Sequence, residues 1–132
     1  NFSVIVVDDR PEFANHERFP EADECMVSDF TDAVLNLSFS GNEYVVIVTR
    51  GHSHDAEVLK NVLGKKTRYL GMIGSRRKIK IIFDLMRQSG FSEDDIGGVH
   101  APIGLDIHAE TPQEIAVSIV AELIQVRGER SF

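Results

Sequence analysis

The chain has 132 residues and a formal net charge of −7, and this length is enough for one ordinary domain with its own core. Cys25 is the only cysteine, which excludes a disulfide framework or a cysteine-rich zinc module and is typical of a cytoplasmic protein. No apolar run approaches the roughly 20 residues that span a bilayer, and no signal-peptide pattern opens the chain, so we expect neither a membrane protein nor an exported one.

Short apolar runs alternate with helical patterns in the first half of the chain. The run from Ser3 to Asp8 is rich in β-branched residues without polar alternation, which predicts a strand buried on both faces. Glu24 to Val27 is a weaker strand candidate. A helix is predicted from Phe30 to Leu37 with Asp29 as its N-cap, and Tyr44 to Thr49 repeats the buried-strand pattern.

The same alternation continues in the second half. The apolar positions from Val58 to Leu63 predict a helix that ends at Gly64, and Ser53 is a candidate for its N-cap. A further buried strand is predicted from Arg68 to Ile73. A helix is expected from about Ser75 to Gly90, and Gly98 to Ala101 is the last strand candidate.

The last helix has the clearest start. Thr111 is placed as an N-cap, Pro112 as the first helical residue and Glu114 as the acid of a capping box. A narrow polar stripe that includes Ser118 and Glu122 runs along an otherwise apolar helix, so we expect most of it to be buried. Taken together, the elements predict an α/β fold with a parallel sheet and helices on both faces.

The basic residues are concentrated in one region of this acidic chain. No acidic residue lies between Glu57 and Asp84, whereas eight of the fourteen basic residues do. Nucleic-acid binding depends on neutralising many phosphates, so an acidic chain with one basic region is better suited to a small anion. We therefore expect no nucleic-acid partner.

Polar residues follow several predicted strands, and ligands of open α/β sheets bind beyond the carboxyl ends of strands. Asp8 ends the first strand and is a candidate acceptor for ribose hydroxyl groups. The equally weighted alternative is an acid that ends the strand and caps the next segment.

The segment from Thr49 to Asp55 joins a strand to a helix and contains Arg50, Gly51, His52 and His54. Two histidines and an acid are residue types that bind zinc or iron, but their spacing does not require them to converge. We favour a polar loop that faces a ligand, keep helix capping as the alternative, and predict no metal site.

The segment from Gly71 to Lys78 is the most informative. Three basic residues in the first turn of a helix oppose its dipole at a cost of a few tenths of a kcal/mol each. The Ser75 hydroxyl, the guanidinium groups of Arg76 and Arg77 and the backbone near Gly74 together suit a phosphate or another anion. The alternative is a solvated basic helix start, because the spacing matches no known phosphate-binding loop.

The segment from His100 to His108 again joins a strand to a capped helix. Asp106 lies among proline, glycine and apolar residues, which is typical of an ordered loop. It is either a ligand contact or a brace of this loop, and the residues alone leave both open.

Four segments, VVDDRPEFAN, VTRGHSHD, YLGMIGSRRK and HAPIGLDI-x-AETPQEIAVSIVAE, resemble the C-terminal Rossmann-like domain of the XdhC/CoxI family. That family comprises accessory proteins of xanthine dehydrogenase and related molybdenum hydroxylases. The resemblance implies a chaperone that holds molybdenum cofactor, assists its sulfuration with a cysteine desulfurase, and delivers it to the apo-hydroxylase. The runner-up hypothesis, based on the fold and Asp8, is an NAD(P)-dependent oxidoreductase that binds a nucleotide.

Two features depart from that family. Its members carry a separate N-terminal domain with a cysteine motif and a glycine loop that opens the Rossmann domain, and neither occurs here, so Cys25 inherits no role. The family also has a small residue where this chain has His108.

In the Rossmann strand order 3-2-1-4-5-6, the first strand lies between the second and the fourth. If Ser3 to Asp8 is the second strand, this chain lacks the central strand and its glycine loop. We therefore expect residues 1–132 to be a single Rossmann-like domain that forms the C-terminal part of a longer protein. The missing strand would come from preceding residues, from a separate fragment or from a partner chain in a homodimer.

Overall fold

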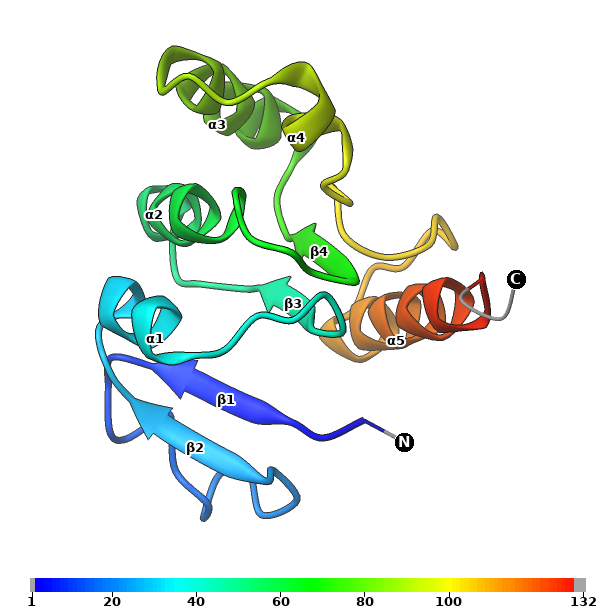
Figure 1. Ribbon diagram of the computed structural model, residues 1–132. Coiled ribbons are helices and arrows are strands. Elements are labelled where there is room, and N and C mark those ends of the chain that lie inside the picture. The colour runs from blue at the N-terminus through cyan, green and yellow to red at the C-terminus, as the bar shows by residue number, and fades with distance from the viewer. Residues whose placement is uncertain (1, 130–132) are drawn as a thin grey trace. The chain divides into compact units, whose positions relative to one another are not determined.

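In the computed structural model, which describes residues 2–129, strands and helices alternate along the chain (Figure 1). The chain forms two compact units, one ending at Ser38 and the other beginning at Phe39. The described elements are β1 (Ile5–Asp8), β2 (Glu24–Val27), α1 (Phe30–Asn36), β3 (Tyr44–Ile47), α2 (His52–Val62), β4 (Tyr69–Met72), α3 (Arg76–Gln88), α4 (Glu93–Gly97) and α5 (Pro112–Glu129).

The first unit contains a pair of parallel strands and one helix. β1 pairs with β2, with Ile5 opposite Glu24 and Asp8 opposite Val27. The helix α1 buries Phe30 and two smaller apolar residues, and it begins where predicted because the Asp29 carboxylate accepts a hydrogen bond from Thr31 N at 2.9 Å.

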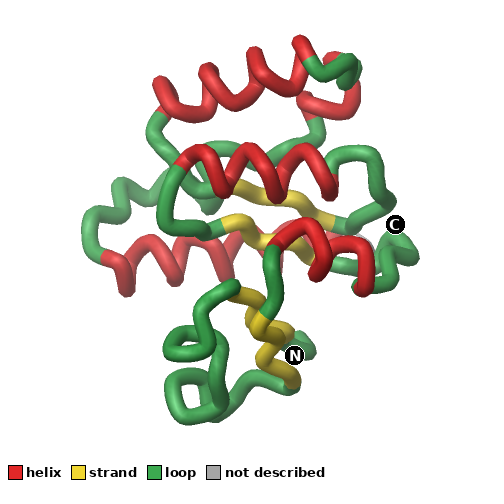
Figure 2. The backbone as a smooth tube through the Cα atoms, turned by 90° about the vertical axis from the view of Figure 1, so that its left-hand side faces the viewer, coloured by secondary structure: helices red, strands yellow, loops and turns green. Residues whose placement is uncertain are grey.

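The second unit contains a second pair of parallel strands, β3 and β4, which lie side by side (Figure 2). Tyr44 is opposite Tyr69, and Ile47 is opposite Met72. The predicted strand from Gly98 to Ala101 is reduced to a bridge: His100 N donates to Leu70 O at 2.8 Å, and Met72 N donates to His100 O at 3.0 Å.

Helices cover both faces of the β3–β4 pair, as predicted for an α/β fold. Figure 1 shows α2 on one side of these strands and α5 on the other. On the α5 side, Tyr69, Ile103 and Val126 form a buried cluster. The parallel pairing and the two helical layers confirm the predicted α/β fold.

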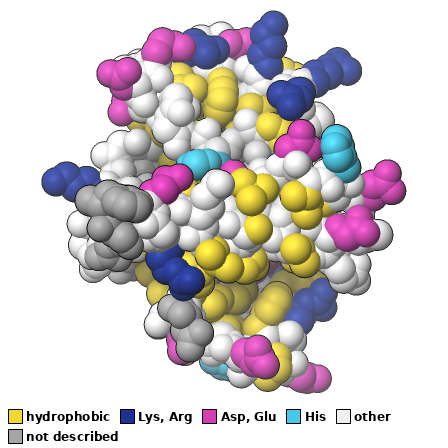
Figure 3. Space-filling model, turned by 90° about the vertical axis from the view of Figure 1, so that its right-hand side faces the viewer, with side chains coloured by type: hydrophobic (Ala, Val, Ile, Leu, Met, Phe, Trp, Pro, Cys, Tyr) yellow, Lys and Arg dark blue, Asp and Glu magenta, His cyan; other side chains and the backbone are white. Residues whose placement is uncertain are grey.

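The orientation of α5 corrects the prediction from its polar stripe. Ser118 and Glu122 are buried, whereas Val117, Val120 and Ile124 are exposed. Figure 3 shows hydrophobic side chains gathered on the face of the molecule on which α5 lies. The helix turns its polar stripe inward because the Glu122 carboxylate accepts buried hydrogen bonds there.

Each pair of strands has an edge at which no strand of the same unit is paired, among the described residues. Among the described residues, β1 is paired with β2 and β3 with β4, in two separate sheets. The Rossmann strand order predicts a further strand next to each pair. Whether such a strand exists stays a prediction.

Hydrogen exchange at β3 tests this prediction, because residues of a parallel strand alternate between their two neighbours. Ile47 O accepts a hydrogen bond from Ile73 N at 3.0 Å, so the backbone groups of Ile47 and Val45 face β4 and those of Val46 face the other edge. In the 132-residue chain, we expect the amide of Val46 to exchange at least about tenfold faster than that of Val45. Equal and strong protection of both amides in a monomer would show that our assignment of the strands is wrong.

Candidate functional site

The turn from β4 into α3 forms as the sequence predicts. Gly74 has a φ of +154°, a backbone conformation that residues other than glycine rarely adopt. Ser75 is the N-cap of α3, and its hydroxyl oxygen accepts a hydrogen bond from Lys78 N at 3.2 Å. This turn places the following basic residues at the carboxyl end of β4.

The basic side chains after this turn are exposed to solvent. Within residues 2–129, the side chains of Arg76, Arg77, Lys78 and Lys80 form no ion pair and donate no hydrogen bond. They lie at the end of α3 where the helix dipole disfavours cations, and the first turn of the helix contains no acid. Their charges are therefore free to bind an anion.

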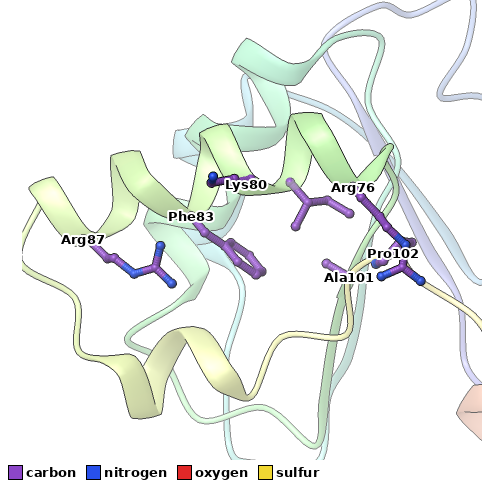
Figure 4. A pocket seen from close by; sticks show the side chains of 7 residues that line it. Arg76, Lys80, Phe83, Arg87, Ala101 and Pro102 are labelled. Carbon is purple, nitrogen blue, oxygen red and sulfur yellow. The ribbon is translucent and has the colours of Figure 1, made fainter.

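Arg76 lines a groove of about 310 Å³ between α3 and the segment Ala101–Pro102 (Figure 4). The groove contains the apolar side chains of Ile79 and Phe83. It is lined by Arg76, Ile79, Lys80, Phe83, Arg87, Ala101 and Pro102.

The cations of this groove differ in their surroundings. Arg87 donates to Asp84 Oδ1 at 2.8 Å and to Glu93 Oε2 at 2.8 Å. The hydrogen bond to Glu93 is the largest cause of the raised pKa of Arg87. Arg87 is thus neutralised, and the positive charge of the groove remains at Arg76 and Lys80.

Sequence reasoning identified Arg76 but missed the rest of the groove. Lys80 and Phe83 of α3 also line the groove. The opposite wall, Pro102, is contributed by a segment distant in the sequence, so no local pattern could have paired it with α3. The spacing of Arg76, Lys80 and Phe83 on one helical face was the available signal.

Hydrogen bonds between Thr49 and the buried Asp55 hold the Thr49–Asp55 loop in place. α2 begins at His52 with Gly51 as its N-cap, so the prediction of Ser53 as N-cap is wrong. The reason is that Asp55 is buried and accepts hydrogen bonds from Thr49 N at 3.1 Å and Thr49 Oγ1 at 2.6 Å. These bonds draw the loop against the first turn of the helix.

The other predicted residues of this loop differ in exposure and in their neighbours, and their role as ligand contacts stays a prediction. Arg50 is exposed, and His54 Nδ1 lies 3.9 Å from Glu57 Oε1. The side chain of His52 lies outside the described part of the structure. Across the described residues, no three histidine, cysteine, aspartate or glutamate side chains are grouped to hold a metal ion.

Asp8 lies in the first unit and is bound to an arginine. Asp8 Oδ1 accepts from Arg10 Nε at 2.9 Å, and Oδ2 accepts from Arg10 Nη2 at 3.1 Å. The Arg10 side chain lowers the pKa of Asp8 below its ordinary value. Both carboxylate oxygens are therefore engaged by Arg10, and the role of Asp8 as a ligand contact stays a prediction.

Asp106 is exposed, and its carboxylate oxygen Oδ1 lies 3.9 Å from His108 Nδ1. His108 has a φ of +57°, in the left-handed region that favours small residues. The loop that contains Asp106 and His108 is attached to α5 at Gly104, whose backbone N donates to Glu122 Oε1 at 3.0 Å. Both alternatives for Asp106, a ligand contact and a brace of this loop, stay predictions.

Glu122 also connects this loop to the sheet, which sequence reasoning missed. Tyr69 donates its hydroxyl hydrogen to Glu122 Oε1 at 2.5 Å, and His100 Nδ1 lies 3.6 Å from the same oxygen. The rings of Tyr69 and His100 stack with their centroids 4.5 Å apart. A single carboxylate oxygen therefore positions α5, the Gly104 loop and the end of the sheet.

This environment makes unfolding sensitive to alkaline pH. Burial raises the pKa of Tyr69 well above its ordinary value, and the hydrogen bond to Glu122 adds to the rise. An unfolded tyrosine ionises near pH ~10, so the contribution of Tyr69 to stability is complete below that pH and lost progressively above it. We expect urea unfolding to show this loss in the wild type and a weaker one in Tyr69→Phe. Identical pH dependence of unfolding in both proteins would contradict this role of Tyr69.

The chain is similar to members of a known protein family. The family model described as the XdhC Rossmann domain matches residues 1–123. The chain is 36% identical over 128 residues to the uncharacterized protein YqeB of Escherichia coli K12, covering 96% of this chain and 23% of that protein. It is 33% identical over 127 residues to a probable xanthine dehydrogenase subunit of Bacillus subtilis 168, covering 96% of this chain and 36% of that protein.

Two further matches extend the comparison. The molybdenum cofactor insertion chaperone PaoD of Escherichia coli K12 is 24% identical over 101 residues, which is 76% of this chain and 32% of that protein. A crystal structure described as a xanthine dehydrogenase from Bacillus halodurans superposes with a TM-score of 0.81 at 35% identity, covering 98% of this chain and 36% of that one. The chain thus spans about a quarter to a third of the length of the relatives it matches.

None of the described helices is long and apolar enough to cross a membrane. The family match covers both units, the groove beside α3 and most of α5. By its sequence and its parallel α/β fold, this chain belongs to the XdhC Rossmann-domain family.

Proposed function

We propose that this domain is part of an accessory protein that binds molybdenum cofactor and helps to insert it into a xanthine dehydrogenase-type hydroxylase. Within that protein, the domain binds the phosphate group of the cofactor through Arg76 and Arg77. Its partners are the apo-hydroxylase and the cysteine desulfurase that supplies sulfur, and it acts as a homodimer. The relative named as a molybdenum cofactor insertion chaperone supports this function.

One observation carries the proposal: four exposed cations at the start of α3 have no anionic partner among the described residues. In a chain with a net charge of −7, such a cluster favours a small anionic ligand over a polymer. Guanidinium groups bind phosphate through paired hydrogen bonds, which suits Arg76 and Arg77.

The chain's residues fit the cofactor through its phosphate rather than through its metal. The described part offers no cluster of metal-ligating side chains, whereas the α3 cations suit a phosphate. The remaining predicted contacts are the loop residues Arg50, Gly51, His52 and His54, together with Asp8 and Asp106. In this proposal the residues of the second unit orient the bound cofactor, which supplies the redox-active molybdenum to the recipient enzyme, and Asp8 in the first unit stays a separate predicted contact.

Replacing both arginines by glutamine tests the proposal. We expect Arg76→Gln/Arg77→Gln to weaken binding of molybdenum cofactor by about a hundredfold, since each lost charge-assisted hydrogen bond costs about 1.5 kcal/mol or more. Removing cations from the start of α3 should leave stability unchanged or raise it slightly. Equilibrium dialysis measures the affinity, and thermal unfolding measures the stability.

Lys60→Gln is the matched control, because Lys60 is exposed on α2 outside the groove. It removes the same type of charge and should change the affinity less than about twofold. If the double variant binds the cofactor as tightly as the wild type and is more stable, these residues are only a solvated helix start.

A further inference from the structure

We propose that the groove beside α3 binds a flat heterocycle that carries a phosphate, with the phosphate at Arg76 and Lys80 and the ring on Phe83. This inference rests on the proposed function and makes it more specific: Arg76 stays a phosphate contact, Lys80 is added as a second one, and Arg77 is not among the residues that line the groove. It assigns binding roles to Lys80, Phe83 and Pro102, which line the groove together with Arg76.

The charges of the groove place an anion at one end. Arg87 is neutralised by Asp84 and Glu93, whereas Arg76 and Lys80 have no ionic partner within residues 2–129. Arg76 and Lys80 are four residues apart, so they are neighbours on one face of the helix. A phosphate between them would satisfy two cations that the described residues leave unpaired.

The middle of the groove is apolar and suits a ring. Phe83 is half-buried, and Figure 4 shows its ring in the space between α3 and the segment that contains Ala101 and Pro102. A heterocycle can stack on an aromatic face, and a proline can close the opposite side. No charged side chain of the groove lies between Lys80 and Phe83 along the helix.

The dimensions limit the ligand to a small molecule. Phe83 is three residues beyond Lys80 and seven beyond Arg76, which corresponds to roughly 5 and 10 Å along the helix axis. A volume of about 310 Å³ is at the lower end of the range for small-molecule sites. A fused ring joined to one phosphate through a short linker matches both values.

The absence of tryptophan from this chain makes a direct test available. In the variant Phe83→Trp, the only tryptophan reports on the ring position. We would titrate this variant with GMP, guanosine and inorganic phosphate. We expect saturable quenching by GMP, binding of guanosine about tenfold weaker than that of GMP, and displacement of GMP by inorganic phosphate without quenching.

Variants separate the two parts of the site. By calorimetry, Lys80→Gln should weaken GMP binding about tenfold, whereas the control Lys60→Gln changes it less than about twofold. Phe83→Ala should weaken GMP binding about tenfold and leave phosphate binding unchanged. Leu85→Ala is the matched control for loss of an exposed apolar side chain from α3 outside the groove.

The failure of this inference is distinguishable from that of the proposed function. GMP that does not bind, or that binds Phe83→Ala as tightly as the wild type, overturns the ring position. If Phe83→Ala then still binds molybdenum cofactor normally and Arg76→Gln/Arg77→Gln does not, the proposed function stands without it. Normal cofactor binding by both variants overturns both.

Discussion

Replacing Glu122 by alanine is expected to lower the free energy of unfolding by about 3 kcal/mol, because it leaves buried donors without an acceptor and opens a cavity. Glu122 is only 9% exposed, and its Oε1 accepts from Tyr69 at 2.5 Å and from Gly104 N at 3.0 Å. The lost bonds also weaken the attachment of the Gly104 loop to α5, which the hydrogen bond from Leu105 N to Ser118 O at 3.1 Å still maintains. Urea unfolding at neutral pH measures the effect.

Gln125→Ala is the control, since Gln125 is exposed on the same helix. It should change the free energy of unfolding by less than about 0.5 kcal/mol. Tyr69→Phe should cost less than Glu122→Ala, because it leaves the hydrogen bond from Gly104 in place. A Glu122→Ala variant as stable as the Gln125→Ala variant would show that the buried carboxylate does not hold α5.

Replacing Gly104 by alanine should also destabilise the domain, by about 3 kcal/mol. Gly104 has a φ of +96°, which strains any residue with a side chain. A methyl group here would also contact Ser118 Oγ and lie 3.2 Å from the backbone carbonyl carbon of Ser118. Since Ser118 is part of α5, the helix would have to move away.

Gly90 provides a matched control for the strain alone. It has the same φ of +96°, but a methyl group at Gly90 would meet no atom within 4 Å. Gly90→Ala is therefore expected to cost about 1 kcal/mol, from the backbone conformation. Equal losses in the two variants, measured by thermal unfolding, would contradict close packing of the Gly104 loop on α5.

The starts of helices were predictable where the side chain of the N-cap residue accepts a hydrogen bond from a backbone N–H of the first helical turn. Asp29 caps α1 as expected, Thr111 and Glu114 form the predicted reciprocal hydrogen bonds at α5, and α3 begins directly after Ser75, close to the predicted start. These interactions are local, so the residues within a few positions determine them. Strand positions were also predictable from continuous apolar runs.

Features that depend on distant residues were not predictable in this way. Ser118 and Glu122 in the polar stripe of α5 are buried, and Glu122 accepts a hydrogen bond from Tyr69, which is 53 residues away in the sequence. The start of α2 depends on the buried bonds between Asp55 and Thr49. The groove likewise requires Pro102 to lie beside α3, so a periodicity analysis of α3 could identify its cations but not the site that they line.

The central claim is that the cations of α3 bind molybdenum cofactor rather than a dinucleotide. The most direct measurement is to purify the protein and identify its bound small molecule by mass spectrometry and elemental analysis. We predict a phosphorylated pterin with molybdenum in the wild type, and its loss from Arg76→Gln/Arg77→Gln but not from Lys60→Gln. Recovery of a nicotinamide dinucleotide instead, or equal cofactor content in all three proteins, would contradict the claim.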